Sequence, residues 1–253
     1  MKFISSRDNP YFKYLRKLAD SSRQRHMAGK TLLDGWHLVD AYRQTIGEPE
    51  TLILSQSTAN AYLAIGDTAA VVLSDGLFAE LSPVKTPTGV LALVAFPVPV
   101  AEKVPEFCLL LEDVQDPGNL GSLLRSAAAA GCDTAYLSTN CADPWSPKAL
   151  RAGMGAHFAL ALRERADLVQ IAAAFPGQVV ATSLTGDHSL YEFDLTGPVA
   201  FVVGNEGAGI SQELQEVASQ RVRIPMPGAV ESLNAAAAAA ICLFERVRQL
   251  QSK

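Results

Sequence analysis

The chain has 253 residues, of which 49% are hydrophobic and 19% are charged, and its formal net charge is −5. This composition is sufficient for a sizeable buried core and excludes an intrinsically disordered chain. The apolar runs are short and interrupted by charge, Gly or Pro, which excludes a membrane-spanning helix. Residues 1–8 lack the apolar core of a secretion signal, and the four cysteines show neither CxxC pairing nor metal-ligand spacing. We therefore expect a cytoplasmic protein with reduced thiols and no metal site.

Basic side chains are concentrated at the beginning of the chain. Residues 1–30 contain eight Lys and Arg against two Asp, a local charge of +6 that leaves −11 for the remainder. A local positive field attracts phosphate whatever the total charge. A solvated helix face produces the same pattern, so charge alone leaves the two interpretations nearly equal.

Residues 1–97 are predicted to form a small α/β domain. A helix is expected over residues 9–19, where Asn9 suits the N-cap, Pro10 suits the first turn and the apolar residues form one stripe. Strand-like runs, with helix-like segments between them, follow at 52–54, 70–73 and 90–96. A stretch with little periodicity, which we interpret as a linker, is then bracketed by Pro97, Pro99 and Pro105.

Residues 106–253 are predicted to form a second, larger α/β domain. Strands are expected at 107–111, 134–137, 179–181, 199–203 and 221–224. Helices are expected at 120–130, 168–175, 211–218 and 233–250. Strands that alternate with helices predict a mostly parallel sheet covered on both faces.

Three strand-to-helix junctions in this second domain carry the polar and glycine residues of interest. They read DPGNLG at 116–121, running on to Arg125, then GNEGAG at 204–209, then IPMPG at 224–228, running on to SLN at 232–234. Strand ends that lead into helix N-termini are where open α/β sheets bind ligands. Three such junctions indicate one composite site, although each alone is a weak signal.

The first junction has an ordinary structural interpretation that covers only part of it. Asn119 lies where an N-cap belongs, and Gly131 lies where the helix should end. Capping does not explain Arg125, roughly one and a half turns into an otherwise small and apolar helix. An arginine there is either a surface charge or a guanidinium directed at phosphate or carboxylate.

The other two junctions are also open to two interpretations. The glycines at 204–209 allow backbone N–H groups to approach a ligand, with Glu206 as an acceptor, but a tight turn with a solvated glutamate fits as well. Their G-x-x-G-x-G spacing departs from the dinucleotide fingerprint. In the third junction Ser232 is expected to cap the next helix and Asn234 adds an amide to its first turn. Three apolar residues line a pocket or simply pack in the core: Ile224, Met226 and Leu233.

Together the junctions resemble the three motifs of the SpoU (TrmH-like) branch of the SPOUT RNA methyltransferases. The matching text is DPGNLGSLLRSAAAAG, VVGNEGAGIS and IPMPGAVESLNAAAAAAICLFE, and the resemblance covers about residues 107–250. The earlier part, including residues 34–35 and 85–90, is similar to the small ribosomal-protein-like RNA-binding domain found in many members.

The resemblance implies a C-terminal trefoil knot within the α/β sheet domain, against the general rule that chains avoid knots. It also implies a homodimer whose paired C-terminal domains complete the site, and S-adenosylmethionine held by the knotted loops. The family's cofactor positions map to Gly204, Ile224, Met226 and Leu233. Its active-site positions map to Arg125, Asn119, Glu206, Ser232 and Asn234.

The implied reaction is methyl transfer to the 2′-hydroxyl of an RNA ribose, in which positioning carries much of the rate. A guanidinium is a poor base at its usual pKa, so Arg125 is either a phosphate clamp or a strongly perturbed base. The other four active-site residues are expected to orient Arg125 and the ribose. The plain alanine run after Asn234, where the family mixes in Val and Ser, affects helix packing more than chemistry.

The leading hypothesis is an S-adenosylmethionine-dependent RNA 2′-O-ribose methyltransferase, with ribosomal RNA ahead of transfer RNA because of the extra N-terminal domain. A non-catalytic RNA-binding protein on the same scaffold is the alternative, and the intact Asn119, Arg125 and Asn234 argue against it. A dinucleotide-dependent oxidoreductase ranks last, because the chain lacks the proper glycine spacing and a ribose-binding acid.

Overall fold

A computed structural model describes residues 2–62, 70–84, 86–97, 105–183 and 188–252. The chain forms two compact units, the first made of Met1–Val98 and Asp143–Phe158, the second of Pro99–Ala142 and Ala159–Lys253. The division expected from the sequence differs at one segment, because it assigned residues 143–158 to the second domain. Part of the predicted linker, Pro99 included, lies outside the described residues.

Buried polar and aromatic contacts join the inserted segment to the rest of the first unit. The Arg25 guanidinium donates to the Asp143 carboxylate at 2.6 and 2.8 Å, and both side chains are at most 10% exposed. The Thr31 hydroxyl donates to the Trp145 carbonyl at 2.8 Å, and the Trp145 ring stacks on Phe96 with 4.6 Å between centroids. Removing one partner of a buried ion pair lowers the free energy of unfolding by several kcal/mol, because the other charge is left buried without a partner. The segment is therefore an integral part of this unit.

The first unit is built on a five-stranded sheet of order β1-β4-β3-β5-β2. Its strands are β1 (Lys2–Ile4), β2 (Lys30–Asp34), β3 (Thr51–Ser55), β4 (Ala70–Leu73) and β5 (Val90–Ala95). β5 runs antiparallel to β2 and β3, whereas β1, β4 and β3 pair in parallel. The helices of this unit are α1 (Pro10–Asp20), α2 (Ser22–Ala28), α3 (Trp36–Thr45), α4 (Gln56–Tyr62), α5 (Asp75–Leu81), α7 (Pro147–Gly153) and α8 (Ala156–Ala159).

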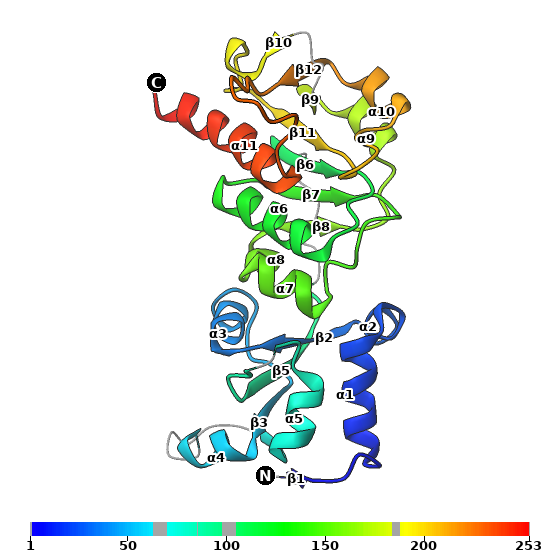
Figure 1. The fold of residues 1–253 in the computed structure, drawn as a ribbon, viewed down its shortest axis with the longest axis vertical. Coiled ribbons are helices and arrows are strands. Elements are labelled where there is room, and N and C mark those ends of the chain that lie inside the picture. The colour runs from blue at the N-terminus through cyan, green and yellow to red at the C-terminus, as the bar shows by residue number, and fades with distance from the viewer. Residues whose placement is uncertain (1, 63–69, 85, 98–104, 184–187, 253) are drawn as a thin grey trace. The chain divides into compact units, whose positions relative to one another are not determined.

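Helix α1 begins where the sequence predicted and covers one face of that sheet together with α5. The Asn9 side chain accepts from the backbone N–H of Tyr11 at 2.9 Å, and Pro10 opens the helix. The apolar stripe of α1 is buried against α5 and the strands, and α3 packs against β2 and β5 (Figure 1). The sequence missed both β1 and β2. β2 nevertheless pairs with β5 along its whole length.

Most of the basic residues near the N-terminus are neutralised locally. Five of the eight Lys and Arg among residues 1–30 form ion pairs with carboxylates of the first unit: Arg7, Lys13, Arg16, Arg25 and Lys30. The local positive field is therefore weaker than the residue count indicates, and that count is poor support for RNA binding.

The second unit is a seven-stranded sheet of order β10-β12-β9-β11-β6-β7-β8 in which every pairing is parallel. This confirms the predicted parallel sheet. Its strands are β6 (Phe107–Leu111), β7 (Thr134–Leu137), β8 (Ala161–Arg163), β9 (Gln178–Thr182), β10 (His188–Ser189), β11 (Val199–Val203) and β12 (Gln220–Arg223). Only the two shortest, β8 and β10, were missed, because neither contains an apolar run.

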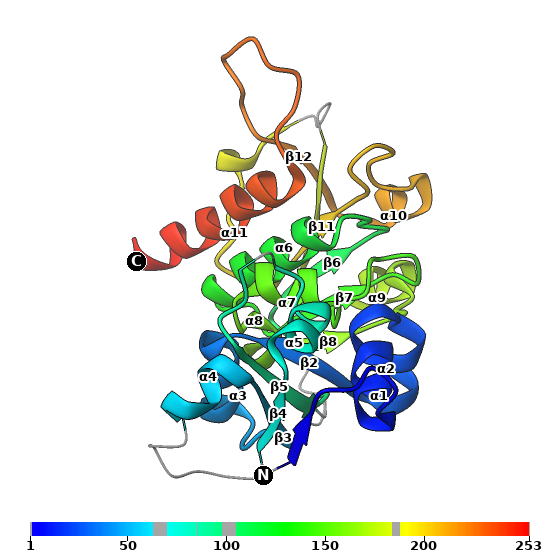
Figure 2. The same cartoon turned by 60° about the horizontal axis from the view of Figure 1, so that its bottom comes forward.

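Helices cover both faces of the second sheet (Figure 1). They are α6 (Pro117–Ala129), α9 (Leu168–Ala174), α10 (Gln212–Val217) and α11 (Ala235–Gln251), with a short 3₁₀ turn at Leu190–Glu192. α9 and α10 bury one face against β6, β9 and β11, while α6 and α11 pack against each other on the opposite face. The connection from β12 to α11 projects away from the sheet (Figure 2). None of the described helices is long and apolar enough to cross a membrane.

His157 is a buried titratable group in the core of the first unit. It is 1% exposed and lies 5.7 Å from the Trp145 ring. Burial lowers the pKa of His157 to about 4, although the Pro144 backbone and the Asp143 carboxylate oppose the shift. An unfolded chain takes up this proton near pH 6.5. The first unit therefore has its full stability above about pH 6.5 and loses this contribution as pH falls toward about 4.

We expect the free energy of unfolding of the first unit to fall by about 2 kcal/mol between pH 7.5 and pH 5 through this residue. Both tryptophans of the chain, Trp36 and Trp145, lie in the first unit, so urea unfolding followed by tryptophan fluorescence measures its stability. His157→Leu should remove this part of the pH dependence, whereas His37→Gln, at an exposed position, should retain it. Equal pH dependence in the wild type and His157→Leu would contradict the assignment.

Candidate active site

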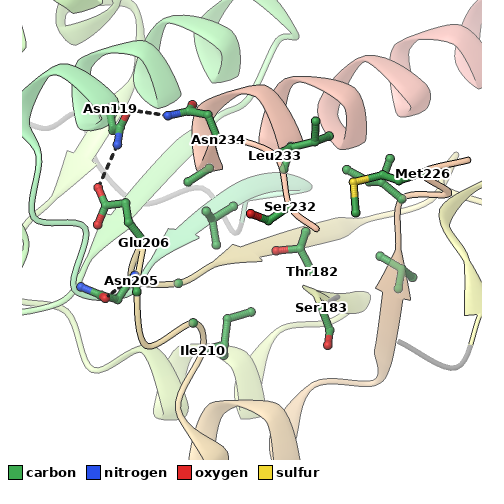
Figure 3. Close-up of a pocket in the computed structure, with 18 residues that line it drawn as sticks. Asn119, Thr182, Ser183, Asn205, Glu206, Ile210, Met226, Ser232, Leu233 and Asn234 are labelled. Atoms are coloured by element: carbon green, nitrogen blue, oxygen red, sulfur yellow. Dashed lines mark hydrogen bonds between the residues drawn. The ribbon is translucent and has the colours of Figure 1, made fainter. Parts of the chain in front are cut away.

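The three predicted junctions meet at one cavity of about 370 Å³ in the second unit (Figure 3). Its walls come from the carboxyl ends of β9, β11 and β12 and from the N-terminal ends of α6 and α11. The volume falls within the roughly 300–1,000 Å³ of small-molecule sites. The prediction of a composite site at strand ends is therefore supported by geometry.

Eight of the nine predicted site residues line this cavity. The four expected at the cofactor are Gly204, Ile224, Met226 and Leu233, and the four expected at the reaction centre are Asn119, Glu206, Ser232 and Asn234. The geometry brings these residues together. Their individual roles stay predictions.

Arg125 is the ninth predicted residue, and it does not line the cavity. Its side chain is exposed on α6, and it makes no hydrogen bond or ion pair with any residue that the structure describes. Arg125 lies six positions after Asn119, which places the two side chains on different sides of the helix. Within one copy of the chain, Arg125 is not part of the site.

The structure corrects both predicted helix caps. Asp116, not Asn119, caps α6, and its carboxylate accepts from the Asn119 backbone N–H at 2.8 Å. Asn234, not Ser232, caps α11, and its Oδ1 accepts from the backbone N–H of Ala236 at 2.9 Å. Pro117 explains the earlier start of α6, because proline suits a first helical turn. The Asn119 amide is thereby free for contacts outside its own helix.

Glu206 joins the first two junctions. Its carboxylate accepts from the backbone N–H of Gln115 at 3.2 Å, from the backbone N–H of Asp116 at 3.3 Å and from Asn119 Nδ2 at 3.1 Å. Partial burial raises the pKa of Glu206, but these hydrogen bonds outweigh burial and hold the pKa below its usual value. Glu206 is thus a hydrogen-bond acceptor for groups of the chain itself and is ionised at neutral pH. Its predicted role toward the ribose stays a prediction.

Asn119 in turn joins the first junction to the third. Asn234 Nδ2 donates to Asn119 Oδ1 at 3.0 Å. A continuous hydrogen-bond chain therefore runs from Glu206 through Asn119 and Asn234 to the first turn of α11 (Figure 3). The three motifs are connected by side chains as well as adjacent in space.

Two carboxylates at the end of β6, which sequence reasoning passed over, fix the neighbouring loops. Glu112 accepts from the Ser211 backbone N–H at 2.7 Å and from its hydroxyl at 2.6 Å, which ties the glycine turn to β6. Asp113 accepts from the Ser138 hydroxyl at 2.5 Å and from Asn140 Nδ2 at 3.2 Å, which ties the loop after β7. Their position directly after a predicted strand was the available signal.

Thr182 and Ser183 also line the cavity and were not predicted. They follow the expected strand at 179–181, whose carboxyl end lies at the same sheet edge as the junctions. The rule that placed the site at strand ends applies to this strand too, but the residues that directly follow it are a threonine and a serine rather than a glycine or asparagine.

Gly204 lies where two backbone segments nearly touch. A Cβ at this position would overlap the Gly209 carbonyl and would lie 2.6 Å from the Ile210 backbone nitrogen. Asn205 and Gly209 exchange two backbone hydrogen bonds of 2.9 Å and close the turn. Only glycine fits this close backbone approach without displacing the wall of the cavity.

Two family models match the chain. The SpoU rRNA Methylase family matches residues 106–244, and the MRM3-like substrate binding domain matches residues 9–92. The chain belongs to the SpoU rRNA methylase family. This confirms the family predicted from the three motifs, and with it the class of enzyme, an RNA methyltransferase that uses S-adenosylmethionine.

Similar proteins cover nearly the whole chain. An uncharacterized tRNA/rRNA methyltransferase of Synechocystis is 33% identical over 97% of this chain and 93% of its own length. The 23S rRNA (guanosine(2553)-2′-O)-methyltransferase RlmP of Bacillus subtilis is 33% identical over 96% of this chain and 98% of its own. The SpoU methyltransferase AviRb from Streptomyces viridochromogenes, solved in complex with the cofactor AdoMet, has a TM-score of 0.85 and 29% identity over 96% of this chain and 99% of that one.

Gly204→Ala is expected to weaken S-adenosylmethionine binding at least about tenfold and to lower Tm, because the added methyl group displaces the cavity wall. Gly207→Ala is the matched control, since its Cβ would meet only Asn205 Oδ1 at 3.6 Å. Isothermal titration calorimetry measures the affinity. Similar affinities for the two variants would show that the close backbone approach is unimportant for the cavity.

Proposed function

We propose that this chain transfers a methyl group from S-adenosylmethionine to the 2′-hydroxyl of a ribose in ribosomal RNA. The observation that carries the proposal is the single cavity at which the three motifs of a SpoU chain are joined by hydrogen bonds. Relatives named for 2′-O-methylation of 23S rRNA, and the substrate-binding domain matched at residues 9–92, support ribosomal RNA as the substrate.

The residues around the cavity suit the cofactor. Ile210, Val222 and Ile224 offer apolar surface to the adenine ring, and the bare backbone at Gly204 permits close approach. Glu206 places a negative charge beside a site that receives a sulfonium cation. When bound, the cofactor supplies the electrophilic methyl group.

The remaining work of the chain is to position the ribose and its neighbouring phosphates. Transfer from a sulfonium requires in-line approach, so holding the hydroxyl in place supplies much of the rate. We propose that Arg125 holds a phosphate of the RNA and assists proton loss from the hydroxyl by stabilising negative charge. Ser232, whose side chain is exposed at the cavity, is proposed to contact the ribose.

The exposed position of Arg125 supports a homodimer in which each cavity receives Arg125 from the partner copy. Helix α6, which carries Arg125, packs against α11. On α11, Phe244 and Leu250 are 45% and 43% exposed, which gives this helix pair apolar surface to bury. We further propose the C-terminal trefoil knot that the family implies. We also propose a cytoplasmic location, consistent with four cysteines free of disulfides.

The function is tested with tritium-labelled S-adenosylmethionine and in-vitro-transcribed 23S rRNA, which carries no methyl groups, beside bulk transfer RNA. Arg125→Ala should reduce transfer to 23S rRNA by roughly 10- to 100-fold, since a charged hydrogen bond contributes about 1.5–3 kcal/mol. Cofactor affinity should be unchanged, because the proposed contact of Arg125 is with an RNA phosphate and not with S-adenosylmethionine.

Arg165→Asn is the control for that experiment. Arg165 is an exposed arginine of the same unit with φ of 54°, a conformation that asparagine tolerates. This variant should transfer methyl groups at the wild-type rate. Absence of transfer by the wild type to either RNA would contradict the proposed function, and transfer to transfer RNA alone would contradict the substrate.

Complementation tests the shared site. Arg125→Ala and Gly204→Ala chains are co-expressed with different tags and the heterodimer is isolated, and its activity is compared with the low activity of each variant homodimer at limiting S-adenosylmethionine. If Arg125 acts on the partner's cavity, the heterodimer contains one intact site and recovers up to about half of wild-type activity. If Arg125 acts on its own cavity, both sites are damaged and the heterodimer stays at that low activity, which would rule out the shared site.

A further inference from the structure

Each side-chain amide of Asn119 and Asn234 can place its oxygen and nitrogen in only one orientation. The partners at both ends of the hydrogen-bond chain determine that orientation. An ionised Glu206 only accepts, so Asn119 must present Nδ2 to it, at 3.1 Å. From the other end, Asn234 Oδ1 caps α11 and accepts two backbone N–H groups. Asn234 must therefore present Nδ2 to Asn119 Oδ1, at 3.0 Å. The two ends require the same polarity.

This polarity determines what the pair can offer to a substrate. Both amide oxygens already accept, Asn119 Oδ1 from Asn234 and Asn234 Oδ1 from the α11 backbone. Each Nδ2 carries two hydrogens and uses one of them. The pair therefore presents two spare N–H donors beside the cavity. Asn119 Oδ1 keeps one lone pair, but an amide oxygen is too weak a base to take the proton of a hydroxyl.

We propose that these two N–H groups bind a phosphodiester oxygen of the RNA next to the ribose that is methylated, and that Glu206 is the positioning residue that sets their direction. This inference rests on the proposed function and deepens it. A phosphodiester oxygen only accepts, which matches donors, whereas the reacting hydroxyl has to give up a proton. Both amides also lie at helix N-terminal ends, whose partial positive charge favours an anion.

The donor and acceptor of the hydrogen bond between residues 206 and 119 can be exchanged by two substitutions that together leave the net charge unchanged. Asn119→Asp alone sets two carboxylates against each other and should lower Tm. Adding Glu206→Gln should restore most of the lost Tm, because the glutamine Nε2 then donates to the new carboxylate while its oxygen still accepts from the Gln115 backbone N–H. Failure of the second substitution to restore Tm would overturn the positioning role of Glu206.

The double variant also tests the ligand, since it replaces the spare donor of residue 119 with a negatively charged acceptor. S-adenosylmethionine affinity is measured beside RNA affinity, because Glu206 and Asn119 both line the cofactor cavity. Affinity for in-vitro-transcribed 23S rRNA should fall at least tenfold in filter binding, and methyl transfer should fall with it. Wild-type RNA affinity in a double variant that keeps its Tm and cofactor affinity would overturn the phosphodiester assignment.

Asn234→Ser tests the second donor without adding charge. Serine is as good an N-cap as asparagine, so α11 should stay capped and Tm should change little, while the long amide donor is lost. RNA affinity should fall severalfold and cofactor affinity should not change. Unchanged RNA affinity in this variant would overturn the donor pair. Because RNA affinity is measured without turnover, failure of the wild type to transfer methyl groups would reject the proposed function independently of these outcomes.

Discussion

Parallel pairing of β11 with β6 on one side and β9 on the other is the constraint on which the site depends. The registers align Val203 with Leu111 and Val202 with Ala181, so all three strands end at the same edge. Residues about 90 positions apart, such as Gln115 and Glu206, come within hydrogen-bond distance only because of that alignment. A shift of one residue in the pairing register would turn every side chain of the shifted strand to the other face of the sheet. The cavity would then not form.

Three carboxylates then hold the loops that follow these strands in place. Glu112, Asp113 and Glu206 together accept from loops that follow β6, β7 and β11, mainly through backbone and small polar donors. Such hydrogen bonds hold irregular backbone that no helix or sheet ladder supports. Rigid placement of this kind is what a methyl transfer governed by positioning requires.

The sequence predicted the second sheet well, because its central strands β6 and β11 are continuous apolar runs of five residues. It placed the two caps wrongly, at Asn119 and Ser232, because both positions lie beside residues that cap equally well and local chemistry does not choose between them. For the same reason the sequence did not show that the Asn119 amide, which does not cap its helix, bonds Glu206 and Asn234 instead. The position of Arg125 outside the cavity was equally beyond reach, since it depends on the rotation of α6 against the sheet.

Residues 143–158 belong to the first unit, so neither unit is a continuous stretch of the chain. A fragment that starts at residue 106 would contain Asp143 and Trp145 without Arg25 and Thr31. The hydrogen bonds from Arg25 to Asp143 and from Thr31 to Trp145 would then be lost. The amino-terminal remainder would then hold an arginine without its carboxylate and an open aromatic surface on Phe96. Exchange of the amino-terminal unit between relatives would accordingly succeed only if this sixteen-residue segment travelled with it.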